Sequence, residues 1–171
     1  AASDVYKRQR WGLDGDRAFR AHYALRCDAS WGVREVRVAL LGATTPRLHV
    51  RADGRGHWTD AHGRPLPALQ GCIDVDLAAT AFTNTLPIRR LALPPGASVE
   101  VAVVYIDVPA LAVSAVRQRY DCLARGPDGG RYRYESLPGA LLPDGFTDEL
   151  LVDADGLVIT YPQLFQRIWA T

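Results

Sequence analysis

The chain has 171 residues, of which 48% are hydrophobic and 23% are charged. This length suits a single domain, and this composition argues against wholesale disorder. No run approaches the ~18 apolar residues that a membrane helix needs, so we expect no membrane span. Twenty basic residues against nineteen acidic ones give a net charge of +1, and they are spread along the chain, which argues against a nucleic-acid partner.

The first residues differ in composition from the rest. Lys7 is the only lysine, since the other nineteen basic residues are arginines, and the chain contains no methionine. Residues 1–9 resemble an adapter-derived leader. We therefore expect 1–10 to be a non-native or disordered leader and 11–171 to be one β domain that lacks its N-terminal strands.

The cysteines carry information about metals and compartment. Cys27, Cys72 and Cys122 are widely spaced and odd in number, which argues against disulfides and a zinc site. They favour a reducing compartment, so we expect a cytoplasmic protein with no metal and no cofactor, although a signal peptide lost with the missing N-terminal end would not be visible.

Apolar side chains alternate with polar ones along almost the whole chain, which is the pattern of strands with one buried face. The expected strands cover 19–27, 36–40, 48–52, 72–77, 86–93, 98–108, 113–123, 131–136, 146–152 and 157–161. Glycine-rich turns at 126–130 and 153–156 predict two hairpins. Only 163–170 predicts a short helix. The pattern predicts an all-β domain built from antiparallel neighbours, as in a sandwich, barrel or roll.

An acidic pair begins the most unusual polar stretch. Asp74 and Asp76 lie on one face of a predicted strand, roughly 6.5–7 Å apart. They could act as a general acid and base, as in glycoside hydrolases, or form ion pairs with Arg89 or Arg90. The two arginines are adjacent, so on a strand they point to opposite faces. Asn84 suits either a turn or a ligand contact.

A second polar cluster lies on the expected strand 113–123. Arg117 and Arg119 share one face, while Gln118 and Tyr120 share the other. A glutamine and a tyrosine on an inward face both need hydrogen-bond partners, which suits a sugar or head group. The alternative is a face exposed to solvent.

Four motifs arrive in a familiar order: GCIDVDL at 71–77, FTNTLPIRRL at 82–91, VRQRY at 116–120 and DADGLVITYPQLFQR at 153–167. Together they resemble the bacterial family of putative glycolipid-binding proteins, over about residues 11–167. Two positions depart from the family pattern: Ala81 stands where a proline is usual, and Asp121 where a threonine is usual. Neither departure affects the polar residues considered above.

The resemblance implies one long antiparallel sheet curled into an open or spiral β-roll, a half-barrel similar to lipoprotein carriers, with a sugar-bearing lipid as ligand. We expect non-enzymatic binding of this amphipathic small molecule, with the acyl chain on an apolar concave face. The expected ligand-binding residues at its rim are Asp74, Asp76, Asn84, Thr85, Arg89, Arg90, Gln118, Arg119, Tyr120 and Tyr161. Two alternatives stay open: an enzyme acting on a carbohydrate or small metabolite through the Asp pair, and a structural or partner-binding β domain.

Overall fold

The structure, a computed structural model, describes residues 4–14, 17–42, 46–140, 143–162 and 164–168. These residues are mostly β, with 53% in strands and one short α-helix, which confirms the expected all-β class. They form two compact units. Unit 1 comprises residues 1–79 and 103–115, and unit 2 comprises 80–102 and 116–171.

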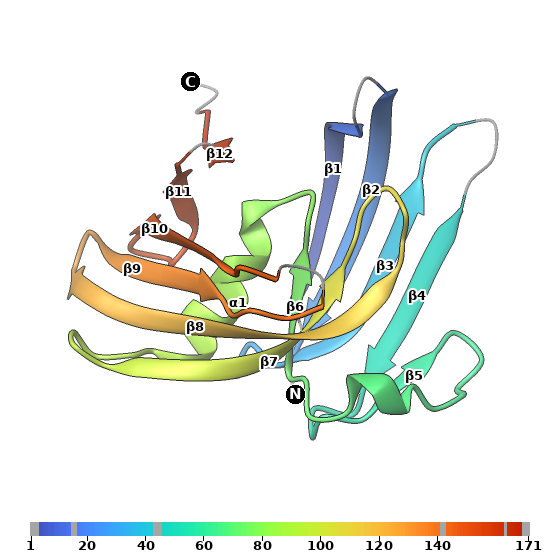
Figure 1. The fold of residues 1–171 in the computed structure, drawn as a ribbon, viewed down its shortest axis with the longest axis horizontal. Helices are drawn as coiled ribbons and strands as arrows, with labels where there is room; N and C mark the ends of the chain where they lie inside the picture. Colours follow the sequence, from blue (N-terminus) through green and yellow to red (C-terminus); the bar gives the residue numbers. More distant parts are fainter. Residues whose placement is uncertain (1–3, 15–16, 43–45, 141–142, 163, 169–171) are drawn as a thin grey trace. The chain divides into compact units, whose positions relative to one another are not determined.

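Unit 1 contains a five-stranded antiparallel sheet (Figure 1). Its strands pair in chain order: β1 (Asp4–Asp14), β2 (Arg17–Cys27), β3 (Val33–Leu40), β4 (Arg47–Ala52) and β5 (Trp58–Asp60). Alternation gives β2 to β4 one buried face, with Tyr23, Val36 and Val50 at most 1% exposed, while arginines occupy the opposite face. Strand β1 includes residues 4–10 of the expected leader, whose non-native origin stays a prediction.

A seven-stranded sheet has the order β12-β11-β10-β9-β8-β7-β6. A 3₁₀ helix, η1 (Pro67–Leu69), precedes β6 (Asp74–Leu77), which pairs with β7 (Ser98–Ile106) in a parallel register. We expected antiparallel neighbours throughout. Parallel strands need a long crossover, and the residues between β6 and β7 supply one that contains the helices η2 (Ala81–Asn84) and α1 (Thr85–Leu91).

Helix α1 corrects the expected strand 86–93. The hydroxyl of Thr80 accepts a hydrogen bond from the Phe82 amide, which begins the turns that lead into the helix. Pro87 stands in the first turn of α1, where its missing N–H costs no hydrogen bond. Arg89 and Arg90 stand in the last turn, where positive charge stabilises the helix end. The two arginines are therefore helical neighbours and do not face opposite ways across a sheet.

The remaining strands confirm both hairpins. Strands β8 (Val113–Gly126) and β9 (Gly129–Ser136) form the first, and β10 (Phe146–Asp153) and β11 (Val158–Tyr161) form the second. The expected helix at 163–170 is wrong over its described residues, since β12 (Phe165–Gln166) pairs with β11. The chain turns back after Tyr161, whose carbonyl accepts from the Leu164 amide, and Pro162 stands in this turn.

One face of unit 2, which we call the inner face, is packed against α1 and η2. Figure 1 shows β8 and β9 as bowed ribbons with α1 on their concave side. The buried cluster that joins helix and sheet contains Ala81, Ile88, Leu93, Tyr120, Cys122, Tyr132, Tyr134, Leu150, Val152 and Tyr161. We expected an apolar wall here that is open to an acyl chain. In unit 2 the side chains of α1 and its neighbours cover that wall instead.

No helix among the described residues is long and apolar enough to cross a membrane.

Candidate ligand site

A chain of buried polar side chains crosses the inner face. Tyr120 Oη lies 2.8 Å from Asn84 Oδ1 and 3.3 Å from Gln118 Oε1, so its single proton serves the closer oxygen. Gln118 Nε2 donates to Tyr134 Oη over 2.8 Å. All four residues are at most 4% exposed. The sequence correctly places Gln118 and Tyr120 on one face, and their partners are two further protein side chains, Asn84 and Tyr134.

Removing the Tyr120 hydroxyl tests how much this series of buried polar side chains stabilises unit 2. Tyr120→Phe leaves the buried Asn84 oxygen without its donor, and we expect the free energy of unfolding to fall by about 1.5 kcal/mol. Urea denaturation of Tyr120→Phe, Asn84→Ala and the double variant measures this. Because both single changes break one bond, the double variant should lose less than their sum. Strictly additive losses would contradict the coupling.

A series of aromatic rings extends from this polar chain along the inner face. The Tyr134 ring centre lies 5.4 Å from that of Tyr120 and 5.9 Å from that of Tyr161, both edge to face. Tyr161 in turn lies 6.1 Å from Phe146 and 6.3 Å from Phe165. These separations are typical of favourable aromatic pairs. The rings therefore connect the buried amides to side chains at the surface, since Phe146 is 37% exposed.

A hollow of about 300 Å³ lies where this aromatic series ends. It is lined by Thr160, Tyr161, Pro162, Leu164, Phe165 and Gln166, from β11, β12 and the turn between them. The mostly buried Tyr161 and the exposed Leu164 and Gln166 give it both apolar and polar walls. This volume is at the lower end of the range for small-molecule sites, and mixed walls are their usual composition.

An ion pair holds the chain that follows the hollow. Arg167 Nη1 lies 2.6 Å from Asp153 Oδ2, and the Arg167 amide donates to the Ile159 carbonyl. Burial opposes ionisation of Asp153, but hydrogen bonds from Arg167 and Leu157 outweigh it and lower its pKa. The ion pair therefore fixes the C-terminal side of the hollow to the turn between β10 and β11.

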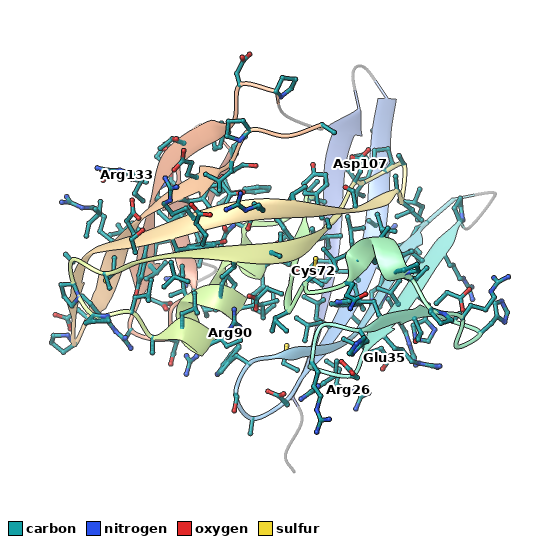
Figure 2. The ribbon with its side chains drawn as sticks, turned by 60° about the horizontal axis from the view of Figure 1, so that its bottom comes forward. Arg26, Glu35, Cys72, Arg90, Asp107 and Arg133 are labelled. Atoms are coloured by element: carbon teal, nitrogen blue, oxygen red, sulfur yellow. The ribbon has the colours of Figure 1, made fainter. Side chains whose placement is uncertain are left out.

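Arg89 on α1 and Arg119 on β8, two of the expected site residues, have protein partners. Arg119 lies on the outer face of β8 and forms ion pairs with Glu100 and Glu135. The Arg89 guanidinium donates to the Asp155 carbonyl. Arg90 follows on the same helix and is half-buried (Figure 2). A ligand head group would compete with the contacts of Arg89 and Arg119.

Thr85 differs from these three residues. It is fully buried, and its hydroxyl hydrogen-bonds to none of the described residues. In this structure its hydroxyl is therefore closed to a ligand.

The acidic pair lies in unit 1. Asp74 is fully buried and Asp76 is half-buried, two residues apart on β6 as expected. Burial raises the pKa of the neighbouring Cys72 thiol to about 11, and the Asp74 charge acts in the same direction, so this cysteine stays protonated and unreactive. Acid–base catalysis by the pair stays a prediction. No group of three or more His, Cys, Asp or Glu in the described part of the chain is placed to hold a metal ion.

Sequence reasoning placed only Tyr161 in the lining of the hollow. Phe165 and Gln166 fell within the expected helix at 163–170. The signal that could have found them is Pro162, which favours a turn directly after the expected strand 157–161, before the residues that pair with β11.

The fold and this hollow together define an all-β protein with a small, aromatic-lined surface site. The chain belongs to the family described as "Putative glycolipid-binding", whose model matches residues 8–167. It is similar to the crystal structure of a DUF1089-family protein from Pseudomonas aeruginosa, with 40% sequence identity and a TM-score of 0.83. That match covers 98% of this chain and 93% of the other. No curated protein matches the chain.

Proposed function

We propose that the protein binds an amphipathic, sugar-bearing lipid without changing it chemically, and that the hollow on β11 and β12 contacts its head group. The observation that carries this proposal is the aromatic pair Tyr161 and Phe165 in a hollow that Thr160 and Gln166 also line. Aromatic rings stack on the apolar faces of sugars, while an amide and a hydroxyl bind sugar hydroxyls. Membership of the family supports the same class of ligand.

Apolar side chains near the hollow provide contact for the lipid chain. Leu164 is 54% exposed in its lining, and the Phe146 ring lies beside that of Tyr161. Exposed apolar side chains that gather in this way are typical of interaction sites.

Within this proposal, Gln118 and Tyr120 act as positioning residues. Gln118 donates a hydrogen bond to the hydroxyl of Tyr134, whose ring packs against that of Tyr161.

The three cysteines are free and buried, which supports our proposal of a reducing, cytoplasmic compartment.

Soluble amphiphiles test the proposal. Dodecyl maltoside below its micellar concentration supplies both a sugar and a chain, maltose supplies the sugar alone, and dodecylphosphocholine supplies the chain with another head group. We expect dodecyl maltoside to bind tightest by isothermal titration, and its amide shifts in NMR spectra to centre on β11 and β12. Failure to bind any of the three would contradict the proposal.

Phe165→Ala removes the more exposed ring of the aromatic pair Tyr161 and Phe165. We expect it to weaken dodecyl maltoside binding about fivefold, which corresponds to the loss of about 1 kcal/mol of aromatic contact. Leu41→Ala is the control, because Leu41 is also an exposed apolar side chain, 40% exposed, and it belongs to unit 1 rather than to the strands that line the hollow. Equal effects of the two substitutions would place the ligand elsewhere.

A further inference from the structure

The outer face of the sheet in unit 1 collects positive charge that the sequence spreads over thirty residues. The strands β2, β3 and β4 pair so that Arg26 lies opposite Glu35, Glu35 opposite Arg51, and Arg37 opposite His49. Because side chains alternate, these residues share the face opposite the buried core. We call this surface the basic face; its charged and histidine side chains among the described residues are Arg20, His22, Arg26, Glu35, Arg37, Arg47, His49 and Arg51.

One carboxylate stands at the centre of the basic face. Glu35 lies 3.3 Å from Arg26, 2.8 Å from Arg37, 2.7 Å from His49 and 3.5 Å from Arg51 (Figure 2 shows Arg26 and Glu35). Burial alone would raise the pKa of Glu35, but hydrogen bonds from His49 and Arg37 outweigh it and lower the pKa to about 2. Glu35 therefore stays ionised, and its single negative charge faces three arginine charges, those of Arg26, Arg37 and Arg51.

The outer face of β7 to β10 in unit 2 does not have this excess of positive charge. There Arg117, Arg119, Arg131 and Arg133 are matched by Glu100, Asp121, Glu135 and Glu149. Four arginines meet four carboxylates in unit 2, whereas on β2 to β4 of unit 1 the single carboxylate of Glu35 pairs with three arginines and His49. The net charge of +1 for the whole chain conceals this difference.

We propose that the basic face docks on an anionic phospholipid surface. The guanidinium groups are accessible, since the side chains of Arg26, Arg37 and Arg51 are 43%, 61% and 47% exposed. A negatively charged leaflet attracts such clusters. The proposal builds on the proposed function, because a protein whose ligand is a lipid must meet a membrane to collect or deliver it.

A membrane fits this face better than nucleic acid does. Proteins that bind single-stranded nucleic acid combine basic side chains with aromatic rings on which the bases stack. The described members of the basic face include no Phe, Tyr or Trp. Reading a duplex needs an element that enters a groove. A charged leaflet requires neither feature.

Vesicle flotation with the full chain tests the proposal. We expect binding to vesicles of phosphatidylcholine and phosphatidylglycerol in equal parts, no binding to phosphatidylcholine alone, and release by salt. The double substitution Arg37→Gln and Arg51→Gln should weaken binding about 25-fold, at about fivefold for each arginine lost near an anionic surface. Glu35→Gln should strengthen it about fivefold, because it removes the central negative charge.

The control removes the same charge from the other unit. Arg131→Gln with Arg133→Gln acts on the outer face of β9, where both side chains are at least half exposed, and should leave vesicle binding unchanged. Equal loss in the two double variants, or tighter binding to a DNA duplex than to the anionic vesicles, would overturn the proposal. These vesicles contain no sugar, and Phe165→Ala should bind them normally, so failure of docking and failure of the head-group site remain distinguishable.

Discussion

Gly129→Ala is expected to destabilise the protein by at least about 3 kcal/mol. Gly129 begins β9 with a φ of +141°, a backbone conformation that residues with a side chain rarely adopt. An added Cβ would lie 2.1 Å from the Val152 carbonyl oxygen and 2.9 Å from the carbonyl carbon of Asp153. Both atoms belong to the backbone of β10, so relief requires β9 and β10 to separate at the end of their ladder.

The matched control lies at the other end of the same turn. Gly126 has nothing within 4 Å of the position of an added Cβ, and it pairs with Gly129 across the hairpin. Gly126→Ala should therefore change the free energy of unfolding by less than about 1 kcal/mol. Urea denaturation followed by circular dichroism compares the two variants. Similar stabilities would mean that the hairpin tolerates a side chain at both positions and would refute the expected strain.

Strands were predictable from this sequence because burial on one face imposes its own period. The alternation along 98–106 and 146–152, for example, reflects side chains that the sheet places on opposite faces. The glycine-containing turns then made the two hairpins predictable. The alternation could not reveal that β6 and β7 are parallel, because strand direction depends on the length and course of the connection between them.

The errors occurred where a short segment supports two structures. The FTNTLPIRRL block has β-branched and apolar residues that suit a strand, yet its polar start, early proline and basic end are helix signals. Mistaking this helix for a strand left the inner face apparently open. Gln118 and Tyr120 were correctly paired on one face, but the sequence could not show that Asn84, from a distant segment, would supply a partner.

Acid should remove a specific contribution of Glu35 to stability. Its pKa is about 2 in the folded protein, against an ordinary value of 4.5, so the unfolded chain binds more protons between these values. The stabilisation is complete above about pH 5 and is lost as the pH falls towards 2. A shift of this size corresponds to about 3 kcal/mol, and because solvent screens the exposed arginine partners, we expect a loss of about 2 kcal/mol.

Denaturation of the wild type and Glu35→Gln at a series of pH values isolates this contribution from other carboxylates. We expect the wild type to be more stable by about 2 kcal/mol at pH 7 and the two proteins to converge near pH 2. Glu149→Gln, which removes one partner of an exposed ion pair in unit 2, should differ from the wild type by less than about 1 kcal/mol. A constant difference between wild type and Glu35→Gln across this range would show that the carboxylate acts through packing, because only a charge effect titrates away.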